Sequence, residues 1–139
     1  MGRVKETLKG YAKYRSKGHY IFLLHRISGL TTIIFLTLHI TTTSMVFFAP
    51  GLYEKMIKIF RNPIVMLAEI IMAFFVVYHG VNGLRIAYFD LFRPDLWERE
   101  PTSRWMSGVF ITAIVLWLPA VGIMGFDLLK YGFGLFGGK

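Results

Sequence analysis

The sequence predicts an all-α integral membrane protein with three transmembrane helices. Three apolar segments, residues 20–48, 63–89 and 105–129, are each long enough to cross a bilayer, which takes about 20 residues at the helical rise. The 139 residues are 55% hydrophobic, and the mean hydropathy is +0.53. Lys and Arg flank the apolar segments, so the net charge of +8 indicates membrane orientation rather than nucleic-acid binding. The chain has no Cys, so any redox centre held by its own side chains needs His ligands.

The first helix is expected over residues 20–48, after a basic arm of residues 1–19 that carries a single acid, Glu6. A secretory signal has an apolar core of only about 7–15 residues, so we interpret the longer segment as an uncleaved membrane helix. Pro50 and Gly51 then stop it. Residues 49–62 alternate apolar and charged side chains, which predicts a short amphipathic connection along the far membrane surface.

Pro63 opens the second helix, which is expected to run to residue 89, because Pro is tolerated in the first turn. Residues 90–104 are charged and contain Pro, so they are expected in water or among the headgroups. The third helix is expected over residues 105–129, with Gly122 and Gly125 as close-packing positions. No repeat or second domain is visible, and residues 1–139 are interpreted as one domain.

The distribution of Lys and Arg predicts the orientation. Seven lie between the N-terminus and Arg26 and four in residues 85–104, against three in the first loop and two in the tail. The positive-inside rule therefore places the N-terminus in the cytoplasm and the C-terminus outside. The start of the chain lacks an Arg- and Ser-rich, acid-poor presequence, so a prokaryotic plasma membrane is expected.

His79 lies within the second apolar segment and is the leading site candidate. An ionisable ring in hydrocarbon costs free energy unless it has a partner, so it is read by default as a functional group in a bundle interior. Neutral imidazole in such a place commonly ligates a metal or haem iron. Gly80 and Gly83 leave room beside it for a flat, bulky group, and Gly29 leaves room for a ring or partner helix.

A polar cluster is expected at the membrane face where the first helix begins and the second ends. His25 and Arg26 lie at one of these ends and Arg85 and Asp90 at the other, with Ser28 close by in the sequence. Their combination near a buried histidine favours a ligand pocket. The alternative is that both arginines extend to phospholipid headgroups.

His39 is fourteen residues after His25, which returns it to nearly the same helix face about 21 Å deeper. Its depth differs from that of His79 by roughly 10 Å, so the two are not expected to bind one iron. Either His39 binds a second cofactor stacked below the first, or it packs and hydrogen-bonds with Thr42, Thr43 or a neighbouring helix.

Two motifs resemble a known family. The first is His25-Arg26-Ile27-Ser28-Gly29-Leu30, and the second is His79-Gly80-Val81-Asn82-Gly83-Leu84-Arg85 followed by Asp90. Together, in a three-helix chain, they resemble the cytochrome b subunit of succinate dehydrogenase over roughly residues 20–125. The resemblance implies half of a heterodimeric anchor bundle, paired with a second hydrophobic anchor subunit. An iron–sulfur subunit and a flavoprotein would dock on the cytoplasmic side and hold the iron–sulfur clusters and FAD.

The resemblance also implies roles for individual residues. His79 would be an axial ligand of haem b, Arg26 and Ser28 would bind quinone, and His25 and Arg85 would contact haem propionates or the pocket rim. This chain would then pass electrons to membrane quinone, as part of the tricarboxylic acid cycle and respiratory chain, without a succinate-oxidising site of its own. The opposite haem ligand would come from a partner, and the whole complex could form a higher oligomer.

The sequence departs from the family at two positions. Ubiquinone-reading members often have a serine three residues before the His-Arg pair, and here that residue is Phe22. One-haem members typically lack a histidine deep in the first helix, so His39 resembles the two-haem kind. We therefore expect one or two haems, and the quinone is expected to be either ubiquinone or menaquinone.

Three alternatives stay open. The chain could be a haem-free structural anchor of the same complex, in which the histidines only pack. It could serve fumarate reduction, because partner subunits and quinone potential set that direction. It could also be a small transport or assembly subunit that uses Glu69 and the histidines as a proton path.

Overall fold

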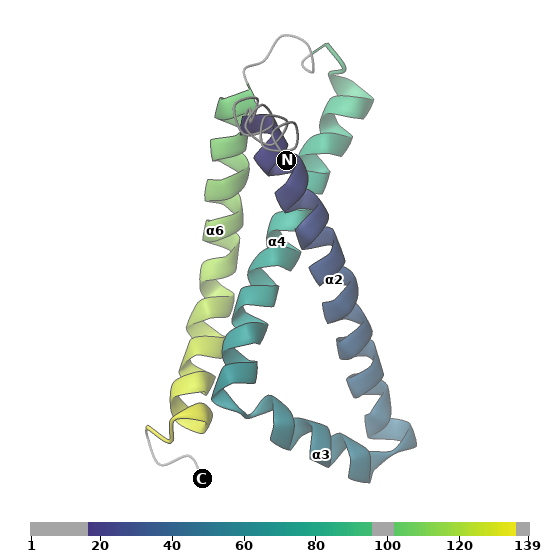
Figure 1. Cartoon of the computed structure of the whole chain (residues 1–139), viewed down its shortest axis with the longest axis vertical. Coiled ribbons are helices and arrows are strands. Elements are labelled where there is room, and N and C mark those ends of the chain that lie inside the picture. The colour runs from purple at the N-terminus through teal and green to yellow at the C-terminus, as the bar shows by residue number, and fades with distance from the viewer. Residues whose placement is uncertain (1–16, 96–101, 136–139) are drawn as a thin grey trace, which may run out of the picture.

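The computed structural model describes residues 17–95 and 102–135, and these ranges are helical with no strand. The elements in chain order are α2 (Lys17–Phe48), α3 (Pro50–Phe60), α4 (Pro63–Phe92), α6 (Thr102–Asp127) and the π-helical turn η1 (Leu128–Gly132), as Figure 1 shows. Most of the expected basic arm and the middle of the expected loop 90–104 lie outside the described residues.

The predicted all-α fold with three membrane-spanning helices is confirmed. The apolar spans are Tyr20–Phe48, Pro63–Phe92 and Arg104–Gly132, with mean hydropathies of 1.8, 2.2 and 2.3. They extend slightly beyond the expected second and third ranges, because α4 continues to Phe92 and η1 adds a turn after α6. Lipid can cover the many apolar side chains that remain exposed along these spans.

Local chemistry explains where the helices meet. Ala49 separates α2 from α3, whose first residue is Pro50. Asn62 caps α4, because its side-chain Oδ1 accepts a hydrogen bond from the backbone N–H of Ile64 at 2.9 Å. Pro63 follows at the first helical position, where its missing N–H costs nothing.

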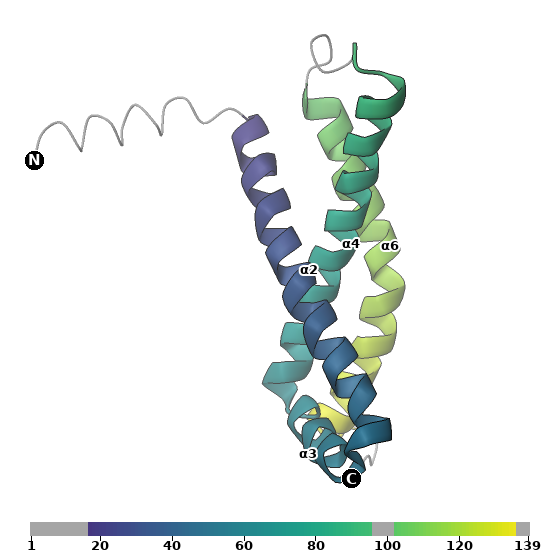
Figure 2. The ribbon, with the colours of Figure 1, turned by 90° about the vertical axis from the view of Figure 1, so that its right-hand side faces the viewer.

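The three spans form a splayed bundle with α4 between α2 and α6 (Figure 1). The helix α2 crosses α4 obliquely, and the two separate toward the end of the bundle where α3 spans the gap between them (Figures 1 and 2). The start of α2, the end of α4 and the start of α6 lie at the opposite end. His25 and His79 are therefore brought to the part of the bundle where α2 and α4 meet.

The core lies mainly between α4 and α6. Tyr78 is fully buried and packs with Val109 and Ala113 of α6. The indole Nε1–H of Trp117 donates a hydrogen bond to the carbonyl oxygen of Ile70 at 3.0 Å, which ties α6 to α4 within the membrane segment.

Gly122 and Gly125, which were expected as close-packing positions, have no packing contact within the described chain. A Cβ added at either glycine would meet nothing within 4 Å, because both lie on a part of α6 that no other described helix covers.

Candidate functional site

His79 of α4 and His25 of α2 form the centre of the candidate site. Their imidazole rings are stacked, with centroids 4.4 Å apart and planes within 8° of parallel. The crossing of α2 and α4 creates this contact between residues that are far apart in the sequence. Both rings are half-buried.

Ser28 connects the two histidines. It is fully buried, and its hydroxyl donates a hydrogen bond to the carbonyl oxygen of His25 at 2.9 Å. The same hydroxyl oxygen lies 3.3 Å from Nδ1 of His79, and the carbonyl oxygen of His25 lies 3.4 Å from that nitrogen. A single imidazole nitrogen therefore has two oxygen neighbours on α2.

This network favours one tautomer of His79. A carbonyl oxygen can only accept, and the Ser28 hydroxyl has used its proton on His25, so both oxygens can accept from a proton on Nδ1 of His79. With the proton on Nδ1, the lone pair lies on Nε2. In this form Nε2 can ligate a metal while Nδ1–H donates to an oxygen acceptor, as is usual for metal-binding histidines.

Gly29, one turn after His25, leaves room for a ring as expected, and the ring that approaches it is that of His79. A Cβ built on Gly29 would lie 3.0 Å from Cε1 of His79 and 3.4 Å from Nδ1. At Gly80 and Gly83 an added Cβ would meet nothing within 4 Å, so the side of α4 that bears them is open within this chain.

The two arginines of the expected cluster lie in different surroundings. Arg26 is exposed, and its guanidinium lies 4.4 Å from the ring centroid of Phe22. Arg85 is half-buried and donates from Nη1 to Oδ1 of Asn82 at 3.3 Å. Arg26 and Ser28, which the sequence grouped as a quinone pair, therefore point to different sides of α2, because they are only two residues apart on one helix.

Three buried polar atoms near this site have no hydrogen-bond partner among the described residues: Nδ1 of His25, the hydroxyl of Tyr78 and Nε of Arg85. An unsatisfied polar group in a membrane interior costs several kcal/mol, so such atoms point to a ligand, water or partner chain. Tyr78 and Asn82 were not selected from the sequence. Their spacing from Arg85, seven and three residues, was the available signal for a shared helix face.

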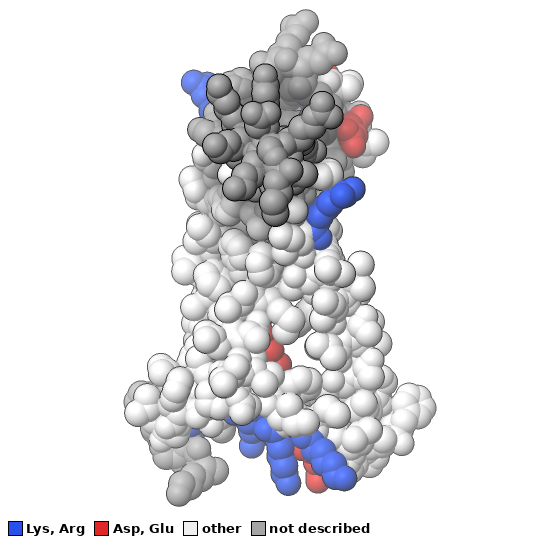
Figure 3. Space-filling model, in the orientation of Figure 1, with Lys and Arg blue, Asp and Glu red and all other residues white. Residues whose placement is uncertain are grey.

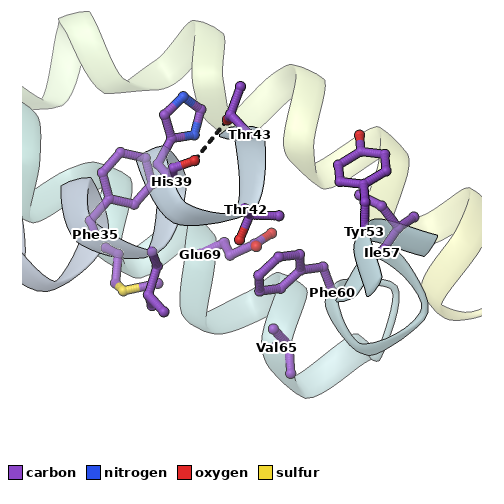
Figure 4. A pocket seen from close by; sticks show the side chains of 11 residues that line it. Phe35, His39, Thr42, Thr43, Tyr53, Ile57, Phe60, Val65 and Glu69 are labelled. Carbon is purple, nitrogen blue, oxygen red and sulfur yellow. Dashed lines mark hydrogen bonds between the residues drawn. The ribbon is translucent and has the colours of Figure 1, made fainter. Parts of the chain in front are cut away.

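His39 lies away from this centre, in a cavity of ≈ 300 Å³ between α2, α3 and α4 (Figure 4). Its ring stacks on Phe35 at 5.8 Å between centroids. Glu69 of α4 lines the same cavity and makes no ion pair with Lys55 or Lys58, all three being described residues. The rest of the lining is mostly apolar and aromatic and includes Leu38, Thr42, Thr43, Tyr53, Ile57, Phe60, Val65 and Met72.

The described residues contain no group of three or more His, Cys, Asp or Glu side chains arranged to hold a metal ion. Nor can His25 act opposite His79 on one iron in this arrangement. A metal binds in the plane of an imidazole ring, whereas these rings lie face to face. A haem held by His79 would therefore need any second ligand from a group other than His25.

Just beyond α4, outside the membrane-spanning segments, Arg93 pairs with Asp95. Nε of Arg93 lies 3.1 Å from Oδ1 of Asp95 and Nη2 lies 3.2 Å from Oδ2. The hydrogen bond from Arg93 lowers the pKa of the Asp95 carboxyl. Asp90, the acid of the second motif, is exposed at the end of α4.

Comparison with known proteins identifies a family and a relative. Residues 6–122 match the family model described as succinate dehydrogenase/fumarate reductase transmembrane subunit. The chain is also 29% identical over 119 residues to the succinate dehydrogenase 2 membrane subunit SdhC of Mycobacterium tuberculosis, and the match covers 82% of each protein.

Proposed function

The chain belongs to the succinate dehydrogenase/fumarate reductase transmembrane subunits, and from this premise we propose that it binds haem b through His79 and delivers electrons to quinone. Its role as a membrane-anchor subunit follows from the family and from its three spans. We further propose that a second anchor subunit, an iron–sulfur subunit and a flavoprotein assemble with it. The flavoprotein would carry the succinate- or fumarate-reacting site.

The observation that carries the haem proposal is the hydrogen-bond network on Nδ1 of His79. The Ser28 hydroxyl oxygen and the carbonyl oxygen of His25 both lie within hydrogen-bond distance of this nitrogen. In the tautomer with the proton on Nδ1 both oxygens accept from it, Nε2 keeps its lone pair and the ring has a defined orientation. The stacked ring of His25 covers a face of the imidazole, whereas a metal binds in the ring plane, so stacking does not block ligation. Ser28 is on this argument a positioning residue for His79.

The surroundings of His79 also suit a haem. The open side of α4 at Gly80 and Gly83 would accept a flat ring or the helix that brings the second ligand. Half-buried Arg85, with Nε unpartnered in the described chain, would pair with a propionate. When bound, the haem supplies a one-electron centre within the membrane.

We place the quinone at the same membrane face, near the start of α2. Arg26 is exposed there and can donate hydrogen bonds to a quinone oxygen. The buried Nδ1 of His25 has no partner among the described residues and is a second group able to bond a quinone oxygen or a propionate. The Ser28 hydroxyl is already shared by His25 and His79, so we assign it to the haem ligand rather than to quinone.

We propose one haem for this chain. The His39 ring stacks on Phe35 in a separate cavity that it shares with the Glu69 carboxylate, and no network like that on His79 holds its ring nitrogens among the described residues. Its hydrogen-bonded atom is the backbone oxygen, which accepts from Thr43 at 2.7 Å.

The test is a pyridine haemochrome assay on the purified complex, normalised to flavin, for the wild type, His79→Ala and His39→Ala. We expect one haem per flavin, lost in His79→Ala and kept in the matched His39→Ala control. Two haems, with each replacement removing one, would place a second haem on His39. A complex that retains its flavoprotein but holds no haem would show that the chain is a haem-free structural anchor. A chain that purifies without flavin would favour a transport or assembly subunit.

A further inference from the structure

A surface rich in basic side chains lies at the end of the bundle opposite the start of α2. It is formed by Lys55 and Lys58 of α3, Arg61 directly after α3, and Lys130 of η1; we call these four residues the α3 basic surface. Figure 3 shows Lys and Arg gathered at this end, with Asp or Glu atoms beside them, below a band in which uncharged side chains predominate. The three residues from the α3 segment are exposed.

The helix α3 is amphipathic and lies across the end of the bundle (Figure 1). Its apolar side chains Tyr53, Ile57 and Phe60 face the cavity between α2 and α4 (Figure 4). Lys55, Lys58 and Arg61 recur at three-residue spacing and therefore occupy neighbouring positions on the other side. A helix with this division lies in the plane of the membrane interface, with its cations at headgroup depth.

The cations of this surface outnumber the acids beside them, because Glu54, next to Lys55 and one turn before Lys58, is the one acidic residue of α3. The guanidinium of Arg61 and the ammonium of Lys130 both lie over the ring of Tyr131, at 5.2 Å and 5.0 Å from its centroid. No carboxylate lies within ion-pair distance of the four residues in the part of the chain that the structure describes. Each cation is attracted to the face of the ring, and two cations gathered at one ring add to the positive potential that an approaching anion meets.

We propose that the α3 basic surface binds the phosphate groups of anionic phospholipids in the leaflet at the α3 end. The helix lies where headgroups lie, and its cations outnumber its one acid, Glu54, with which no ion pair forms among the described residues. Each Lys or Arg near an anionic lipid surface strengthens binding to anionic over neutral lipid about fivefold, and salt screens this preference. This inference does not depend on haem or quinone binding, because α3 adjoins the start of α4, whereas His79 lies in the second half of that helix.

The test measures lipid selectivity of the whole purified complex in phosphatidylcholine vesicles. Spin-labelled phosphatidylglycerol and spin-labelled phosphatidylcholine are compared by the motionally restricted fraction of their electron paramagnetic resonance spectra. The variants are Lys58→Gln with Arg61→Gln, and the charge-preserving control is Lys58→Arg with Arg61→Lys. Flavin content checks assembly, and the single change Lys55→Gln serves if the double variant does not assemble.

We expect the wild type to prefer phosphatidylglycerol, the glutamine variant to lose about fivefold of that preference per charge removed, and the control to retain it. The preference should also fall with rising salt. An equal preference in wild type and glutamine variant would overturn the proposal, as would a wild type with no preference. Loss of a co-purifying protein in the glutamine variant, with lipid selectivity unchanged, would overturn it in favour of an acidic protein partner.

Discussion

Replacing Gly29 by Ala tests the contact between α2 and the proposed haem ligand. The added Cβ would lie 3.0 Å from Cε1 of His79 and 3.4 Å from Nδ1, against an optimal carbon–carbon separation of about 3.5–4.0 Å. Either the imidazole or α2 must therefore shift by a few tenths of an ångström. The ring of His25, stacked on that of His79, limits the freedom of His79 to give way.

Two opposing energies act on the stability of the Gly29→Ala variant. Overpacking a well-filled site costs about 1–3 kcal/mol. Alanine is better than glycine in a helix interior by roughly 0.5–1 kcal/mol, which offsets part of that cost. The net loss of stability is thus small, and a melting temperature alone is a poor reporter of the contact.

The hydrogen bonds on His79 are the more sensitive reporter. Its Nδ1 lies 3.3 Å from the Ser28 hydroxyl and 3.4 Å from the His25 carbonyl, both near the upper limit of hydrogen-bond length. A further few tenths of an ångström removes them. Loss of the groups that orient a metal-bound histidine typically weakens metal affinity about 10–100-fold, so we expect Gly29→Ala to lower the haem content.

The assay is the haem-to-flavin ratio of the purified complex, with the haem reduction potential as a second readout. Gly122→Ala is the matched control, because its Cβ meets nothing within 4 Å, and we expect full haem and equal or greater stability. Gly83→Ala also meets nothing in this chain, so a loss of haem there would locate the cofactor or a partner helix on that side of α4. Wild-type haem content and potential in Gly29→Ala would refute the geometry argued for His79.

Three further outcomes are expected. Ser28→Ala should raise the haem reduction potential, measured by redox titration, because His79 loses one acceptor and becomes a less electron-rich ligand; an unchanged potential would contradict the positioning role. Asn62→Ala should lower the stability of the complex by about 1 kcal/mol through loss of the α4 cap, and Asn62→Asp should keep it, as thermal unfolding would reveal. Arg93→Gln should return the pKa of Asp95 toward its ordinary value in a nuclear magnetic resonance titration. Because the folded-state pKa of Asp95 is lowered, its ion pair with Arg93 stabilises the fold above the ordinary carboxyl pKa, and this stabilisation is lost as the pH falls through the folded-state pKa. An Asp95 pKa that does not change in Arg93→Gln would argue against the pair.

The membrane fold was predictable because it depends on local properties of the chain. Runs of apolar residues long enough to cross a bilayer define the three spans, and a helix satisfies its own backbone groups there whatever surrounds it. The connection before α4 was predictable for a similar reason, since Pro63 restricts only its immediate neighbours. Gly122 has no packing partner within the described chain, because glycine permits close contact but does not require it.

The candidate site was only partly predictable. His79 could be selected from the sequence because its cost in hydrocarbon depends on depth, and depth follows from position within one helix. The sequence could not show that the ring of His25 stacks on that of His79, or that the Ser28 hydroxyl lies beside Nδ1 of His79. It also could not show that Arg26 lies on the outer side of α2. Helical periodicity determines which residues share a face of one helix. The crossing of α2 over α4 determines which faces meet, and it arises from packing along the whole length of both helices.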